Sequence, residues 1–188
     1  MDDTTIAIVV ILIGAVILAG LGWFWYRRSR SRSLRESFGP EYERTVAKTG
    51  RSEGEKLLNE RRKRVERYDL HPLPADDRVR FLKRWDDVQA RFVDDPQAAI
   101  SDAQKLVDEV MEARGYPTGD AQRQQEDVSV ESPLVVSRYR EARRIASRNE
   151  AGEASTEDLR LAIQHYRALF QTLLESGATV EEVEAHAR

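Results

Sequence analysis

Residues 75–115 read ADDRVRFLKRWDDVQARFVDDPQAAISDAQKLVDEVMEARG, and this stretch decides the fold. Its apolar residues recur at three- and four-residue steps, the spacing of amphipathic helices. Asp95-Pro96 combines a helix-capping side chain with a proline at the first helical position. Because only Asp94 and Asp95 separate the two periodic segments, we predict an antiparallel hairpin. The residues expected inside it are Phe81, Leu82, Trp85, Val88, Phe92, Ala99, Ala103, Leu106, Val107, Val110 and Met111.

A second hairpin is predicted further along the chain. Ser132-Pro133 begins one helix, which ends near Gly152, and Ser155 or Thr156 caps the next, which ends at Gly177. Two hairpins of this length are enough for a four-helix bundle, placed at residues 74–176. The inward residues are Val135, Tyr139, Ala142 and Ile145, then Leu159, Ala162, Ile163, Tyr166, Leu169, Phe170 and Leu173.

The remaining segments also favour helices. Short charged helices are expected at 41–49 and 52–68, within a basic neck at 27–73. A short C-terminal helix is expected at 177–188, with Thr179 and Glu182 as its capping box. No segment shows the strict alternation of a strand, and β-branched residues do not cluster outside the N-terminal apolar run, so the predicted fold class is all-α.

An apolar run at the N-terminus predicts a membrane anchor. Ile6 to Tyr26 form 21 residues without a charge, which as a helix match the hydrocarbon thickness of a bilayer. Trp23, Trp25 and Tyr26 stand where aromatic rings meet lipid headgroups. We therefore predict a transmembrane helix at 6–26, with a short extracytoplasmic N-terminus at 1–5.

The charges beside this run predict its orientation. Asp2 and Asp3 precede it, whereas five arginines follow it, and basic residues stay on the cytoplasmic side. The bundle is therefore expected in the cytoplasm, with the arginines against lipid headgroups. A cleaved signal peptide is the alternative, although its n-region would be basic. The five arginines are Arg27, Arg28, Arg30, Arg32 and Arg35.

Small residues inside the run suggest a further contact. Ala15, Ala19 and Gly22 share one helix face, and small residues allow a second helix to approach closely. A homodimer through this face is one interpretation. The other is that alanine and glycine are ordinary in membrane helices.

Charge is divided along the chain. Residues 27–67 carry a net charge of +7, and residues 69–188 a net charge of −8. The run Arg61-Arg62-Lys63-Arg64 resembles a nucleic-acid patch, but four consecutive helical positions point in different directions. No aromatic stacking platform accompanies it, so we expect no specific nucleic-acid binding.

Several short motifs resemble an uncharacterised family of bacterial membrane-anchored proteins. They are Phe38-Gly39-Pro40-Glu41-Tyr42-Glu43-Arg44, Arg114-Gly115-Tyr116-Pro117, Thr156-Glu157-Asp158-Leu159-Arg160 and His165-Tyr166-Arg167. The resemblance spans most of residues 34–174. It implies a bacterial inner-membrane setting, and it brings no activity, cofactor or catalytic residue.

Signatures of enzyme chemistry are absent from the sequence. There is no cysteine, and the three histidines are not spaced as metal ligands. No phosphate-binding glycine loop or nucleophile elbow is present. We therefore predict no cofactor, no metal site and no catalytic residue.

Two functions remain as hypotheses. The first is a membrane-anchored interaction or scaffold module for an unknown cytoplasmic protein, with Phe38, Tyr42 and Tyr116 as anchors for the partner. The alternative for these rings is packing on the bundle. The second function is a membrane-tethered enzyme or small-ligand binder that uses the bundle interior, with His165-Tyr166-Arg167 as its suggestive cluster.

Overall fold

The computed structural model describes residues 31–117 and 119–176, together with Gly14, Leu18, Leu21 and Trp25. All regular structure in these residues is helical, which confirms the all-α prediction for the part of the chain described. The chain forms two compact units, residues 1–58 and 59–188. The boundary predicted between neck and bundle lies further along the chain, after residue 73.

The predicted transmembrane helix requires a correction. Among the residues that the structure describes, no helix is long and apolar enough to cross a membrane. The two 20-residue helices, Ala75–Asp94 and Thr156–Glu175, carry charged side chains along their lengths. The prediction of a transmembrane helix within the all-α fold is therefore wrong for the described residues. The single-pass inner-membrane localisation, which was derived from that helix, is wrong for them as well. Of the run at 6–26, only the four isolated residues named above are described.

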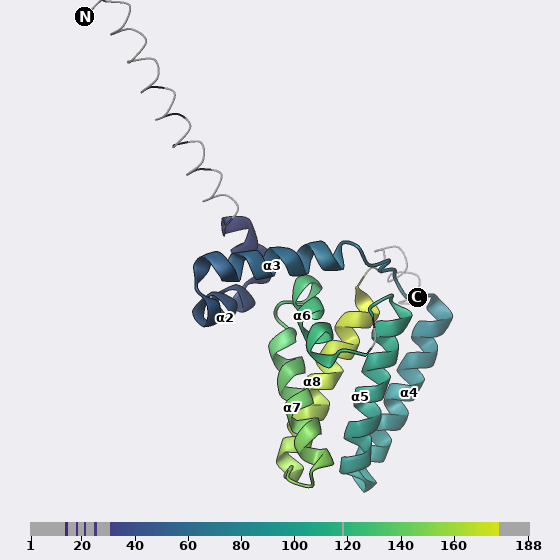
Figure 1. Ribbon diagram of the computed structural model, residues 1–188. Helices are drawn as coiled ribbons and strands as arrows, with labels where there is room; N and C mark the ends of the chain where they lie inside the picture. The colour runs from purple at the N-terminus through teal and green to yellow at the C-terminus, as the bar shows by residue number, and fades with distance from the viewer. Residues whose placement is uncertain are drawn as a thin grey trace, which may run out of the picture. The chain divides into compact units, whose positions relative to one another are not determined.

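The first unit is a small helical assembly. Residues 31–38 are helical and are followed by α2 (Pro40–Thr49) and the first turns of α3 (Arg51–Val65) (Figure 1). At Gly54 the two labelled helices approach closely, since a Cβ there would lie 3.1 Å from the Val46 Cα. The buried apolar residues of the unit are Leu34, Phe38, Tyr42 and Leu58.

The second unit contains the helical bundle. It comprises the end of α3 and five further helices, which are α4 (Ala75–Asp94), α5 (Pro96–Ala113), α6 (Ala121–Glu131), α7 (Val136–Glu150) and α8 (Thr156–Glu175). Both predicted hairpins form, because α4 lies beside α5 and α7 beside α8 (Figure 1). The hairpins join through α5 and α8, and α6 packs on α7. Helix α4 is therefore at the edge of the bundle.

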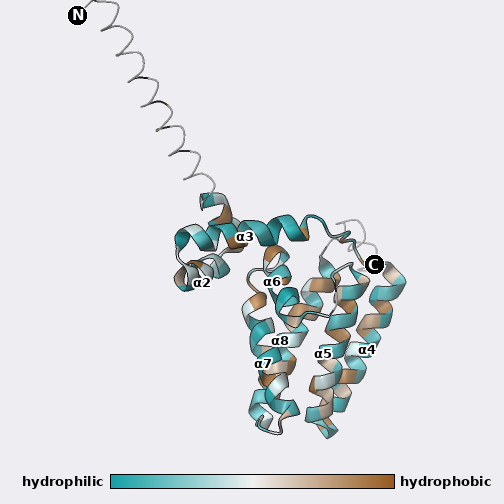
Figure 2. Cartoon of the chain, in the orientation of Figure 1, coloured by the Kyte–Doolittle hydropathy of each residue, from teal (hydrophilic) through white to brown (hydrophobic). Residues whose placement is uncertain are grey.

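Aromatic rings bind the helices of the bundle together. Hydrophobic and hydrophilic positions alternate around each helix (Figure 2), and the apolar positions make one continuous core. Trp85 of α4 stacks on Phe170 of α8 with ring centroids 4.8 Å apart. Tyr139 of α7 meets Tyr166 of α8 edge to face at 6.5 Å. Burial of such rings is a large share of a domain's stabilisation.

Gly115 allows the chain to cross itself at the end of α5. Its φ is +93°, in the region that favours glycine. A Cβ at this position would lie 2.3 Å from the carbonyl oxygen of Asp69, so no side chain fits. The crossing is fixed by the amide of His71, which donates to the Arg114 carbonyl at 3.1 Å.

Side-chain caps mark the starts of α5, α6 and α8. The Asp95 side chain accepts from the Ala98 amide, as predicted, and Ser155 forms a capping box with Asp158. Helix α7 begins at Val136 rather than at Pro133 because residues 132–135 form a turn first. The predicted helix at 177–188 lies outside the described residues.

Candidate functional site

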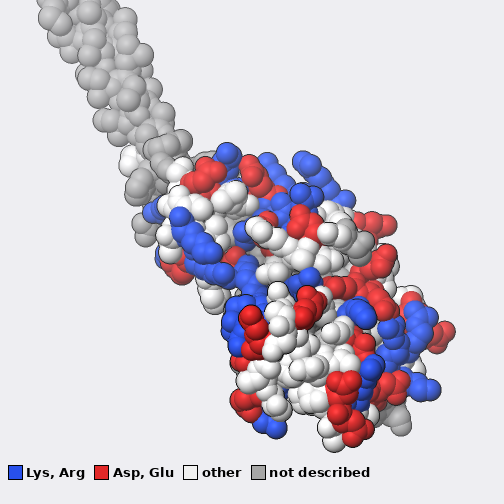
Figure 3. Space-filling view, turned by 60° about the horizontal axis from the view of Figure 1, so that its bottom comes forward, with Lys and Arg blue, Asp and Glu red and all other residues white. Residues whose placement is uncertain are grey.

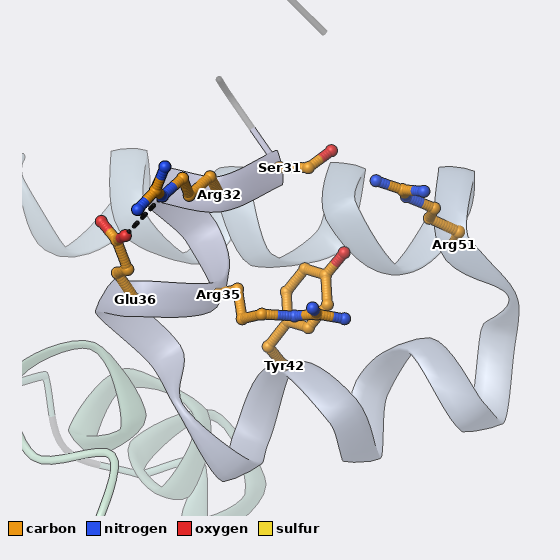
Figure 4. A pocket seen from close by; sticks show the side chains of 6 residues that line it. All are labelled: Ser31, Arg32, Arg35, Glu36, Tyr42 and Arg51. Carbon is orange, nitrogen blue, oxygen red and sulfur yellow. Dashed lines mark hydrogen bonds and ion pairs between the residues drawn. The ribbon is translucent and has the colours of Figure 1, made fainter. Parts of the chain in front are cut away.

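An arginine-lined pocket is the leading candidate site in the first unit. Its volume is about 500 Å³. It lies among the helical residues 31–38, α2 and the start of α3 (Figure 4). The lining residues are Ser31, Arg32, Arg35, Glu36, Tyr42 and Arg51.

The Glu55 carboxylate anchors one side of this pocket. Its Oε1 accepts hydrogen bonds from Ser31 Oγ at 2.7 Å, Tyr42 Oη at 2.8 Å and Arg51 Nε at 3.0 Å. Burial raises the pKa of Glu55, but these three hydrogen bonds outweigh that effect and hold the pKa below its ordinary value. Glu55 therefore stays ionised and fixes the Arg51 guanidinium through Nε.

Arg35 is positioned on the opposite side by two contacts. Its Nε lies 3.0 Å from Glu43 Oε1, and its guanidinium carbon lies 5.2 Å from the centroid of the Tyr42 ring. Figure 4 shows Arg35 extended over that ring and Arg51 reaching toward the hydroxyl end of Tyr42. A cation over an aromatic face is stabilised by the ring's quadrupole. Two guanidinium groups from different segments thus converge on one phenol.

The rim of the pocket is less firmly held. Arg32 Nε bonds Glu36 Oε1 at 3.0 Å, and both side chains are largely exposed. Exposed pairs of this kind contribute roughly 0–1 kcal/mol, so they rearrange easily. In all three pairs the carboxylate bonds Nε. An anion could therefore bind the Nη groups.

A buried carboxylate ties the end of α3 to α6 in the second unit. Asp127 accepts from Arg64 Nη2 at 2.7 Å and from Tyr68 Oη at 2.7 Å. Its side chain is 2% exposed. Arg64 also bonds Glu126. Because a buried charge is tolerated only when it is paired and hydrogen-bonded, this cluster fixes the position of these segments.

A neighbouring cluster orders the connection between α5 and α6. Buried Arg114 lies 3.0 Å from Glu131, and the Tyr116 hydroxyl donates to the same carboxylate at 2.6 Å. Burial, followed by the bond to Glu131, raises the pKa of Tyr116 well above its ordinary value. Tyr116 meets Tyr68 edge to face at 6.5 Å. The two clusters therefore lie next to each other, and both stabilise the structure of the second unit.

The bundle interior contains a third polar group. Arg143 bonds Asp108 at 3.2 Å and the Tyr139 hydroxyl at 3.0 Å. Burial raises the pKa of Asp108 despite the Arg143 charge. Tyr166 donates to Gln104 Oε1 at 3.2 Å. These groups satisfy one another, which is the expected arrangement for polar atoms inside a core.

The outer surface of α4 offers a different kind of site. Val79, Leu82 and Val93 are 58%, 46% and 81% exposed. The prediction that Leu82 lies inside the hairpin is therefore wrong. On the α5 side, a groove of about 290 Å³ is lined by residues of both helices.

Acidic and basic side chains are interspersed over the visible face in Figure 3. No single-sign patch stands out there.

The predicted site residues are distributed as follows. Arg32 and Arg35 line the pocket, and Trp25 is helical and exposed. The proposed partner anchors Phe38, Tyr42 and Tyr116 are 0%, 2% and 3% exposed. Tyr116 packs in the bundle core, as the alternative holds, whereas Phe38 and Tyr42 are buried within the first unit. The other predicted anchor, headgroup and dimer residues lie outside the described residues, namely Ile6, Ala15, Ala19, Gly22, Trp23, Tyr26, Arg27, Arg28 and Arg30.

The histidine cluster proposed for ligand binding does not converge. Tyr166 is buried, His165 is half-buried and Arg167 is exposed. Burial lowers the pKa of His165. Among the described residues, no group of three or more His, Asp or Glu side chains is placed to hold a metal ion.

Sequence reasoning missed Arg51, Ser31 and Glu55 as site residues. The i, i+4 spacing of Arg51 and Glu55 was a readable signal for a helical ion pair. Nothing local links Ser31 to Glu55, because the two are 24 residues apart. Comparison with known proteins adds no assignment, since no family model, curated protein or solved structure matches the chain.

Proposed function

We propose that this chain is a helical protein-interaction module that binds an amphipathic partner helix along one flank of α4. The flank is defined by Val79, Leu82 and Val93. The observation that carries the proposal is their exposure on the edge helix of the bundle. Isolated exposed apolar residues need no explanation, but three that share one helix face are typical of a docking surface.

The helical repeat places these residues together. At 3.6 residues per turn, Val79, Leu82 and Val93 fall on one side of α4. Arg84 and Arg91 fall on the other side, where they bond residues of α5. Arg84 Nη2 lies 2.9 Å from Glu109, and Arg91 Nη1 lies 2.6 Å from Asp102. The flank is therefore the side of α4 that faces away from α5.

Its rigid support makes the flank suitable for docking. Trp85 and Val88 are buried beneath the helix, and the two cross-helix ion pairs fix α4 on α5. A preformed surface loses little conformational entropy on binding.

The chemistry of the flank defines the partner. A helix with apolar residues at i, i+3 and i+4 steps would cover Val79, Leu82 and Val93. Asp86 lies between them in the chain and is exposed. A lysine or arginine on the partner would complement it.

The alternative of a ligand-binding interior has weaker support. The core positions between α5, α7 and α8 are occupied by Tyr139, Tyr166 and their partners, whose polar atoms bond one another. The proposal of an interaction module follows from this filled interior together with the open flank.

Site-specific photo-crosslinking in the native cell tests the proposal. A photoreactive residue at Leu82 should yield one discrete adduct with a partner protein. Val79→Glu combined with Val93→Glu should abolish that adduct, because it places two charges in the contact. Leu161 of α8, which is 40% exposed, is the matched control position.

Two outcomes bear against the proposal. Identical adducts from Leu82 and Leu161 would mean nonspecific capture. An adduct at Leu82 that survives both glutamates would mean that the apolar flank is not the contact. Circular dichroism of the double variant should show unchanged helicity, since surface substitutions usually alter stability by less than about 0.5 kcal/mol.

A further inference from the structure

We propose that the arginine-lined pocket of the first unit binds a small phosphate-bearing anion. The inference is independent of the α4 flank. It rests on the convergence of Arg35 and Arg51 within a pocket of about 500 Å³ (Figure 4).

The first argument is that both guanidinium groups are oriented before a ligand arrives. Glu55 holds Arg51 through Nε, and the face of the Tyr42 ring orients Arg35, whose pair with Glu43 is exposed. Planar guanidinium forks match the oxygens of phosphate bidentately. Because ordering a flexible side chain has an entropic cost, prepositioned arginines bind an anion more tightly than free ones.

The second argument concerns which atoms remain for a ligand. The carboxylates bond Nε of Arg32, Arg35 and Arg51. In each of these pairs the contact to the carboxylate is at Nε, and the Arg51 guanidinium also interacts with the Tyr42 hydroxyl. A guanidinium held at Nε still presents its Nη edge, so Arg51 can keep Glu55 and donate to a ligand.

The third argument concerns competition from the neighbouring acids. Glu36 and Glu43 have side chains that are 67% and 62% exposed, so their pairs are weakened by solvent. A phosphate dianion can displace either carboxylate into water. Glu55 differs, since two hydroxyls and Arg51 already share its charge.

The charges also explain why the ligand should be a dianion. Three arginines face three carboxylates, so the local net charge is close to zero. A monoanion such as acetate would gain too little binding free energy to displace a carboxylate side chain, because the two groups carry the same charge and the same acceptor atoms. A tetrahedral dianion offers more charge and more acceptor oxygens to the two forks.

Calorimetric titration of the full chain tests the inference. The probes are inorganic phosphate, pyrophosphate and acetate at constant ionic strength. We expect saturable binding of phosphate and tighter binding of pyrophosphate, with no saturable binding of acetate. Arg35→Gln and Arg51→Gln should each weaken phosphate binding about tenfold or more, the loss expected for one charge-assisted contact.

Arg44→Gln is the matched control. Arg44 is an exposed arginine of α2 that does not line the pocket. Its replacement should leave the Kd within about twofold, because Arg44 does not line the pocket and an exposed charge is weakened by solvent. If Arg51→Gln perturbs the fold by circular dichroism, Arg35→Gln decides the question, since its side chain is largely exposed.

Three results would overturn the inference. They are phosphate binding no tighter than acetate binding, an equal loss in Arg44→Gln and Arg35→Gln, and unchanged affinity in both pocket variants. An equal loss would assign the binding to general surface charge. Unchanged affinity would place the phosphate elsewhere on the chain.

Discussion

Trp85→Ala tests the packing of the edge helix that carries the proposed flank. Trp85 is 4% exposed, and its ring stacks on Phe170 at 4.8 Å. Replacing a buried tryptophan by alanine costs about 3–5 kcal/mol. The indole Nε1 is buried without a hydrogen-bond partner among the described residues, and removing it offsets part of the loss. We therefore expect destabilisation near the lower end, about 3 kcal/mol.

Trp85→Phe separates the two effects. It keeps an aromatic ring against Phe170 and removes the unpaired N–H group. We expect a smaller cost than for alanine, about 1–2 kcal/mol, because phenylalanine fills most of the indole site and leaves a smaller cavity. The difference between the variants then measures the packing of the ring, independently of its polar atom.

Urea unfolding followed by far-ultraviolet circular dichroism provides the measurement. A double-mutant cycle with Phe170→Ala should give a coupling of about 0.5–1.5 kcal/mol for the stacked pair. A loss under about 1 kcal/mol in Trp85→Ala would refute the reasoning, because it would place the ring outside the cohesive core. Zero coupling would show that the stacking itself contributes nothing.

Two further predictions concern the crossing at α5 and the pocket. Gly115→Ala should destabilise the bundle by more than about 2 kcal/mol in urea unfolding, because it adds a clash with Asp69 to an unfavourable φ. Gly152→Ala, with φ +71° and open space, should lose only the conformational part, about 1 kcal/mol. Because the pKa of Glu55 is lowered by folding, its stabilisation is present above the ordinary value of 4.5 and lost as the pH falls below it. Glu55→Gln should remove that part of the acid dependence in thermal melts between pH 3 and pH 7, and an unchanged profile would contradict the Glu55 assignment.

The helices could be predicted wherever local chemistry decides them. Gly50, Asp95-Pro96 and Ser155 all act within one turn of a helix end, and all three boundaries lie where the sequence places them. The start of α7 was misplaced because a Ser-Pro pair is compatible with both a helix start and a turn. Periodicity alone does not distinguish these two outcomes.

Contacts between residues far apart in the sequence could not be predicted from local patterns. Arg64 and Asp127 are 63 residues apart, yet their bond attaches the end of α3 to the bundle unit. For this reason the division between units falls after Leu58 rather than after the prolines at 72 and 74. The resemblance to anchored bacterial proteins and the absence of enzyme activity stay predictions.

The basic segment illustrates how folding changes the meaning of a charge count. Residues 27–67 sum to +7, which suggests a strongly positive neck. In the structure, Arg61 and Arg64 pair with Glu126 and Asp127. The charge of these two arginines is therefore neutralised inside the second unit. Which charges can still bind a ligand depends on geometry. The pocket arginines line a cavity and therefore carry the inference of anion binding, whereas Arg61 and Arg64 of the denser run at 61–64 pair with acidic residues of α6.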